Sequence, residues 1–137
     1  MEADLLKAKL GPARLSHPVE WDDILDQLTI AGVEIEFRVG SLAYSPDAGG
    51  PGRMMIDPEA SLGAIRHEFR HFLDMRDAGY PGLARYMENQ AEFAKMEVRA
   101  YLEEVKLARE LKHDDIIPGI LRQMKNRVRE IYGESPL

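Results

Sequence analysis

The chain has 137 residues and a net charge of −6, and it contains no cysteine. This length suits one domain with its own hydrophobic core, which we expect to span residues 1–137. The acidic balance, without a strongly basic stripe, argues against nucleic-acid binding, and the lack of cysteine excludes disulfides and cysteine-based zinc sites.

The sequence has no feature of a membrane protein. No apolar run approaches the length that spans a bilayer, and the acidic start at residues 1–4 differs from a basic signal-peptide region. We therefore expect a soluble domain with no membrane partner, which can also be one module cut from a longer, exported protein.

The first quarter of the chain is predicted to be helical. Residues 2–10 favour a short helix, and residues 18–31 favour a longer one with a regular apolar stripe. Pro18 suits the first helical position, acidic residues follow it, and Gly32 ends the helix.

A small sheet is predicted next. Residues 33–39 alternate apolar and charged side chains, which is the pattern of a strand with one buried face. A second short strand is expected at about residues 42–44 and a third at residues 53–56, with a turn-rich loop at 45–52 between them.

The rest of the chain is predicted to be helical. Asp57 should cap the helix that follows the sheet, and Gly79 should end it. A long helix is expected at residues 83–111, and an amphipathic helix at 117–131. The predicted fold class is α+β, with a small antiparallel or mixed N-terminal sheet, an active-site helix and a helical C-terminal half.

The central motif is H-E-x-x-H, formed by His67, Glu68 and His71. Two histidines four residues apart on a helix lie one turn apart on the same face, where both imidazoles can bind one metal ion. Glu68 is turned about 100° around the helix. It can therefore act as a base on a water at the metal without being a ligand.

A zinc peptidase needs a third protein ligand, and Glu97 is the strongest candidate. A carboxylate on an apolar helix face is costly unless a cation compensates it. The residues that share the helix face of Glu97 are all packing residues: Phe93, Ala94, Ala100 and Tyr101. Glu104 is the alternative ligand, and otherwise a residue that orients a ligand; His113 is a further candidate.

Glu97 also has an interpretation without metal, as a carboxylate satisfied by a buried arginine such as Arg99 or Arg66. The basic residues of the last helix are expected to be solvated and to take no part. They are Lys125, Arg127 and Arg129.

Two aspartates follow the motif. In peptidases whose helix breaks at a glycine three residues past the second histidine, the third ligand comes six residues past it, which is Asp77 here. Residue 74 is aspartate rather than glycine, so the helix should continue and carry Asp77 away from the histidines. Asp74 stays on their face, where we expect a salt-bridge partner rather than a group that orients an imidazole.

The motif followed one helix later by Glu97-x-x-Ala100 resembles the gluzincin class of zinc metallopeptidases. With Ile56-Asp57-Pro58 before the helix and Gly79-Tyr80-Pro81-Gly82 after it, the pattern also resembles the compact metallopeptidase domains of bacterial polymorphic toxins. The resemblance covers roughly residues 53–108.

This resemblance implies a zincin-like fold and a zinc-dependent peptidase that cleaves a protein substrate. Zinc would be bound by His67, His71 and Glu97, with Glu68 as the general base. Such families bind substrate by strand addition to an edge strand above the metal, for which residues 53–56 are the expected strand.

The reaction also needs an oxyanion donor. Tyr101, one turn after Glu97, is the expected donor, and the alternatives are Tyr44, Tyr80 and His113. Tyr101 also has a simpler interpretation, as a tyrosine that only packs in the core.

Three functions are compatible with these residues. The first is a secreted toxin or effector peptidase that enters the cytoplasm of a target cell and has a cognate immunity protein. The second is a cytoplasmic regulatory metallopeptidase that cleaves a repressor or antitoxin partner. The third is a non-enzymatic binding module stapled by zinc. Glu68 argues against the third, because a structural site needs no base.

Overall fold

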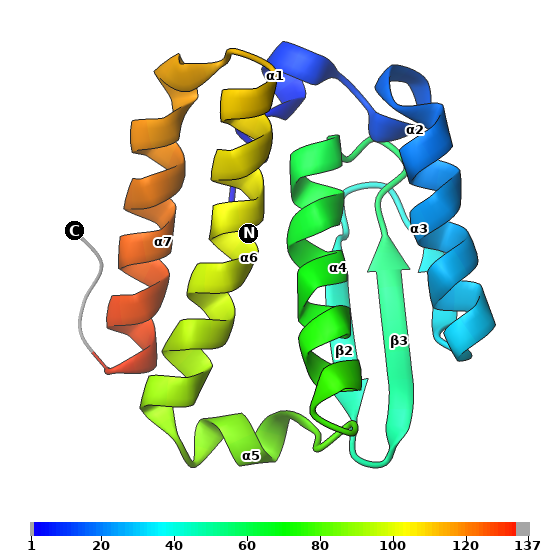
Figure 1. Ribbon diagram of the computed structural model, residues 1–137, viewed down its shortest axis with the longest axis vertical. Coiled ribbons are helices and arrows are strands. Elements are labelled where there is room, and N and C mark those ends of the chain that lie inside the picture. Colours follow the sequence, from blue (N-terminus) through cyan, green and yellow to red (C-terminus); the bar gives the residue numbers. More distant parts are fainter. Residues whose placement is uncertain (1, 134–137) are drawn as a thin grey trace.

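The computed structural model describes residues 2–133 and has the predicted α+β class (Figure 1). Helix α4 lies against the small sheet and runs alongside β2 and β3, with α3 on one side of it and α6 and α7 on the other (Figure 1). In chain order the elements are α1 (Lys7–Leu10), α2 (Ala13–Ser16), α3 (Pro18–Ala31), β1 (Glu34–Phe37), β2 (Ala43–Asp47), β3 (Gly50–Ile56), α4 (Leu62–Asp77), α5 (Leu83–Met87), α6 (Gln90–Glu110), the 3₁₀ turn η1 (Asp114–Ile116) and α7 (Ile117–Ile131).

The sheet has three strands in the order β1-β3-β2. β1 runs parallel to β3, and β2 runs antiparallel to it. β3 contains residues 53–56, so the expectation that these residues form a substrate-binding edge strand is wrong. Both sides of β3 are occupied, because Met54 pairs with Ile35 on one neighbour and with Tyr44 on the other. The free edges belong to β1 and β2.

The predicted loop at residues 45–52 is mostly a β-hairpin. β2 continues to Asp47 and β3 starts at Gly50. The pairing slips between Ser45 and Asp47, at Pro46, which has no N–H to contribute to a ladder. Gly52 has a φ of +80°, and a Cβ at this position would lie 2.4 Å from the carbonyl oxygen of Ser45. Glycine is therefore required at residue 52 for the two strands to approach each other.

The predicted buried face of residues 33–39 exists only where that segment begins. Val33 is buried, but Phe37 and Val39 are 54% and 75% exposed. β1 lies at the edge of the sheet and spans only four residues. The end of β1 at Phe37 is therefore left exposed rather than covered by a helix.

Helix α4 begins later than predicted, at Leu62, with Ser61 as its cap. The Ser61 hydroxyl accepts a hydrogen bond from the Ala64 N–H and donates one to Asp4. Asp57 instead accepts a hydrogen bond from the N–H of Glu59, which closes a local turn. The N-terminal segment, residues 2–4, is thereby tied to the start of α4, the helix that carries the H-E-x-x-H motif.

The predicted long helix is interrupted, giving α5 and then α6. Asn89 caps α6 by accepting a hydrogen bond from the N–H of Glu92. Asn followed three residues later by Glu is a helix-start signal, so the break can be read from the sequence. By contrast, α3 and α7 have the bounds that their apolar periodicity predicts.

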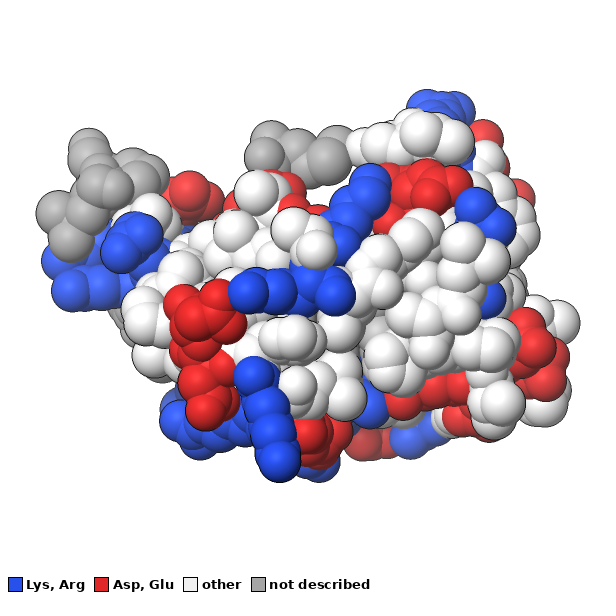
Figure 2. Space-filling model, turned by 90° about the horizontal axis from the view of Figure 1, so that it is seen from above, with Lys and Arg blue, Asp and Glu red and all other residues white. Residues whose placement is uncertain are grey.

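The larger of two hydrophobic clusters among the described residues joins the sheet to the helices. Its fully buried side chains come from every layer and include Leu6, Leu28, Ile56, Phe72, Leu107 and Ile120. Among the described helices, none combines the length and apolar character needed to cross a membrane. On the face seen in Figure 2, acidic and basic side chains are interspersed rather than gathered into a basic stripe.

Candidate metal centre

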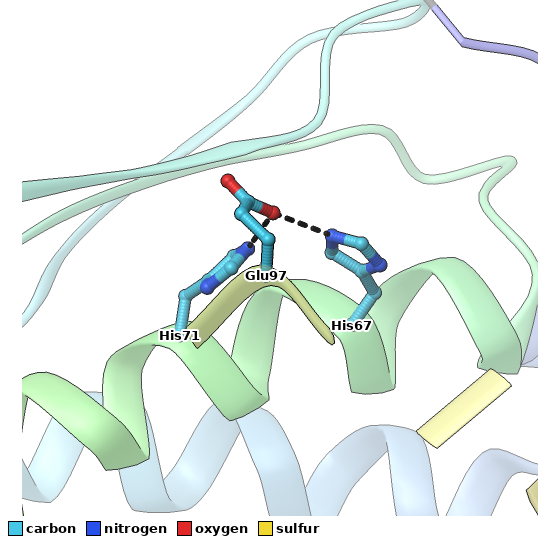
Figure 3. Close-up of side chains that lie close together, drawn as sticks. All are labelled: His67, His71 and Glu97. Atoms are coloured by element: carbon cyan, nitrogen blue, oxygen red, sulfur yellow. Dashed lines mark ion pairs between the residues drawn. The ribbon is translucent and has the colours of Figure 1, made fainter. Parts of the chain in front are cut away.

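The two histidines of the motif lie on one face of α4, where they meet a carboxylate from α6. The ring centroids of His67 and His71 are 5.0 Å apart, as expected one helical turn apart. Figure 3 shows both imidazoles and the Glu97 carboxylate pointing toward one another. One ligand atom from each of the three residues lies within 4.8 Å of the other two.

The distances within this cluster suit a metal ion. Glu97 Oε2 lies 3.3 Å from Nε2 of His71 and 3.9 Å from Nε2 of His67. Ligand atoms of a tetrahedral zinc site with bonds of about 2.0–2.1 Å are about 3.3–3.4 Å apart. The three side chains are only 10–12% exposed. A nitrogen, nitrogen and oxygen donor set of this kind is typical of catalytic zinc sites.

Glu104 orients His67 from the other side of the ring. Its carboxylate lies 2.7 Å from Nδ1 of His67. This contact leaves Nε2 of His67 to face Glu97, and histidine ligands of metals commonly have such a partner. The corresponding Nδ1 of His71 is buried and has no hydrogen-bond partner among the described residues.

The charges around Glu97 keep its carboxylate ionised. Burial alone would raise its pKa, but the hydrogen bond and charge of His71 and the charge of Arg127 outweigh burial and lower the pKa to about 2. Burial would lower the pKa of His67, and the hydrogen bond and charge of Glu104 reverse this and raise it. Bringing buried acids and imidazoles together in this way is typical of metal and catalytic sites.

Glu68 points toward the sheet rather than into the ligand cluster. Its carboxylate accepts a hydrogen bond of 3.0 Å from the N–H of Tyr44 on edge strand β2. Glu68 still lines the same cleft as His67, His71 and Glu97. Glu68 therefore lies beside the cluster and is not one of its three residues.

An open cleft of about 600 Å³ runs over the cluster. β2 lines it with Ala43, Tyr44 and Pro46, and the helices contribute Met75, Phe93 and Met96. Residues 2–4 of the N-terminal segment also line it. The cluster is thus open to a molecule larger than water.

Tyr101, the expected oxyanion donor, is held by the N-terminal segment. Its ring meets that of His67 edge-on, with 4.6 Å between the centroids, and its hydroxyl donates a hydrogen bond to Glu2. The side chain is 2% exposed. Burial, then the hydrogen bond and charge of Glu2, raise its pKa.

Of the alternative donors, Tyr44 also lines the cleft. The Tyr44 hydroxyl donates to the carbonyl of Pro51, 2.7 Å away. His113 follows α6 at the connection to α7, and neither His113 nor Tyr80 is among the residues that line the cleft.

The two aspartates after the motif behave as expected. Asp74 makes ion pairs with Arg70 and Arg99, at 3.2 and 3.0 Å. Helix α4 continues to Asp77, which is exposed and pairs with Arg76.

Arg127 is the residue of this site that the sequence interpretation missed. We expected it to be solvated, but its Nε lies 3.2 Å from Oε1 of Glu97. Arg99 and Arg66, the arginines expected to pair with Glu97 in the interpretation without metal, bind Asp74 and Glu20 instead. The periodicity of α7 shows which residues share a face, but not that this face meets α6 at Glu97.

Comparisons of the chain with protein-family models, with curated proteins and with solved structures give no match.

Proposed function

We propose that the chain is a zincin-like, zinc-dependent metallopeptidase that hydrolyses peptide bonds of a protein substrate. The supporting observation is the convergence of His67, His71 and Glu97 in an open cleft that Glu68 also lines. Glu104, which fixes the ring of His67, adds the outer contact that metal-binding histidines usually have.

The residues of the cleft divide the work of hydrolysis. His67, His71 and Glu97 would bind the zinc ion, which when bound activates a water molecule and polarises the scissile carbonyl. Glu68 removes the proton of the attacking water and delivers it to the leaving amine. Tyr101 is the proposed donor to the oxyanion, a role that requires its hydroxyl to leave Glu2.

The substrate is proposed to bind in an extended form along β2. This strand is an edge of the sheet, lines the cleft and lies directly against the base through the contact between Tyr44 and Glu68. An edge strand offers unpaired backbone groups to a peptide. β2 thus takes the place that we had expected for residues 53–56.

The biological role that we propose is that of a toxin or effector acting on a protein inside a target cell, with a cognate immunity protein. Its support is the resemblance of residues 53–108 to polymorphic-toxin peptidases. A regulatory peptidase that cleaves a repressor or antitoxin would use the same chemistry on a partner in its own cytoplasm.

The contact between Arg127 and Glu97 favours a second candidate, because it can satisfy the buried carboxylate without a metal ion. In that case the chain is a binding module and not an enzyme. Metal analysis separates the two. We expect one zinc ion per chain after purification, and finding none even after zinc reconstitution would contradict the peptidase.

The decisive variant is Glu68→Gln. We expect it to keep zinc, because Glu68 is not a ligand, and to lose about 10²- to 10⁴-fold in hydrolysis, because the water has no base. The amide oxygen of Gln can still accept the Tyr44 N–H, so the fold should be retained. The assay is turnover of a quenched peptide library, and normal turnover of this variant would remove Glu68 from the mechanism.

The effector role has its own test. Expression of the chain inside susceptible bacteria should slow their growth, and Glu68→Gln should relieve the effect. Equal toxicity of both proteins would point to binding rather than proteolysis.

A further inference from the structure

Arg127 is held beside the candidate metal centre by three contacts. Its Nε lies 3.2 Å from Oε1 of Glu97, its Nη1 lies 3.3 Å from Oε2 of Glu130, and its guanidinium carbon lies 5.3 Å from the centre of the Phe93 ring. The side chain is one-third exposed, and it lines the cleft. A guanidinium fixed on several sides has lost much of the freedom that usually makes a surface ion pair weak.

As a result of this placement, the two carboxylate oxygens of Glu97 have different partners. Oε2 faces the Nε2 atoms of His71 and His67, at 3.3 and 3.9 Å. Oε1 is the oxygen that accepts the hydrogen bond from Nε of Arg127, at 3.2 Å. A carboxylate can bind a metal ion through one oxygen or through both. The coordination number of the metal therefore depends on whether Oε1 is free to turn toward it.

We propose that Arg127 is a positioning residue that reserves Oε1 of Glu97, so that Glu97 offers a metal ion Oε2 alone. This inference rests on the proposed metal centre. Three protein ligand atoms leave a fourth position for the water that a hydrolase needs, whereas a second oxygen from Glu97 would compete for that position. Arg127 would thus keep the site open without touching the metal ion.

The charge of Arg127 serves the same end. A lysine in its place keeps a positive charge and N–H donors, and so should still hold Oε1. A glutamine or alanine leaves Oε1 without a cationic partner. In a site this buried, the strongest interaction then available to Oε1 of Glu97 is with the metal ion, so we expect Oε1 to turn toward it.

The test is the visible absorption of the cobalt(II)-substituted protein, because four-coordinate cobalt absorbs more strongly than five-coordinate cobalt. We expect wild type and Arg127→Lys to show the intense four-coordinate spectrum. Arg127→Gln and Arg127→Ala should keep cobalt but lose a large part of that intensity. Arg122→Gln, which removes one positive charge from an exposed position of α7, is the matched control and should resemble wild type.

The spectra of the variants can overturn the inference about Arg127 in two ways. A wild-type spectrum in both Arg127→Gln and Arg127→Ala would overturn the inference, because Oε1 would then stay away from the metal ion without help. Loss of cobalt from both, with circular dichroism showing intact folds, would also overturn it, because Arg127 would be needed for binding rather than for coordination number. If one variant fails to fold, the other decides. A wild-type protein that binds neither zinc nor cobalt contradicts the proposed function itself.

Discussion

Glu104 on α6 and His67 on α4 share a contact of 2.7 Å, although 37 residues separate them in the chain. The contact lies on the far side of the imidazole from Glu97, whose Oε2 is 3.9 Å from Nε2 of the same ring. One helix, α6, thus supplies both the carboxylate that would bind a metal ion and the carboxylate that aims one of the histidines.

This arrangement predicts graded losses of zinc affinity. Glu97→Ala should weaken zinc binding by orders of magnitude, because only two histidine ligands remain. Glu104→Ala should cost about 10- to 100-fold, the usual effect of removing a residue that orients a ligand. Glu92→Ala, at an exposed position of the same helix, should change nothing. Competition with a chromophoric chelator measures all three, and zinc loss in Glu104→Ala but not in Glu97→Ala would reverse the two roles.

A second prediction concerns Tyr101 and Glu2. Tyr101→Phe should keep zinc and lower kcat, because the oxyanion loses a donor, by about 100-fold. Glu2→Ala should not lower kcat, because it only frees the hydroxyl that Glu2 now binds. Steady-state kinetics on both variants tests this, with zinc content as the control. Unchanged turnover in Tyr101→Phe would leave this tyrosine a packing residue.

The hairpin gives a prediction about stability. Gly52→Ala should destabilise the fold by about 2–4 kcal/mol, because the new Cβ meets the Ser45 carbonyl and the backbone has a positive φ. Gly50→Ala is the matched control, since a Cβ there meets nothing within 4 Å. Urea unfolding of the two variants compares them. Equal stability would mean that the hairpin can move without cost.

The ion pair between α3 and α4 predicts a dependence on pH. Two hydrogen bonds, of 2.6 and 2.8 Å, join Glu20 to Arg66, and this contact lowers the pKa of Glu20 below its usual value of 4.5. Because the pKa of Glu20 is lower in the folded protein than in the unfolded chain, its ion pair stabilises the fold fully at pH values above the unfolded-state pKa. This stabilisation is lost as the pH falls through the lowered pKa of the folded state. Glu20→Gln should therefore cost about 1 kcal/mol at pH 7 and less at pH 3. Asp22→Asn, which removes a carboxylate from an exposed position of the same helix, is the matched control.

The parts of the fold that were predictable depend on local patterns. The apolar stripes of α3 and α7 fix their bounds, and the spacing of His67 and His71 fixes the geometry of the pair within one helix. The packing residues around Glu97 likewise indicate that its carboxylate is buried, and it is.

What could not be predicted depends on contacts distant in the chain. The strand order, which makes β3 central and puts β1 and β2 at the edges, follows from pairings that no local pattern encodes. The meeting of Arg127 with Glu97 depends on how α7 packs on α6, and that of Tyr101 with Glu2 on where the N-terminal segment crosses α6. The break before α6 is different, because Asn89 and Glu92 form a local helix-capping pattern that can be recognised in the sequence.

The path of the N-terminal segment has a practical consequence for protein production. Residues 2–4 line the cleft, and Asp4 and Leu6 anchor them to Ser61 and Gly63 at the start of α4. An affinity tag fused to this end would start within a few residues of the candidate metal centre, and a polyhistidine tag would carry its own metal ligands there. Material for metal analysis should therefore be purified with a C-terminal tag that is cleaved before measurement.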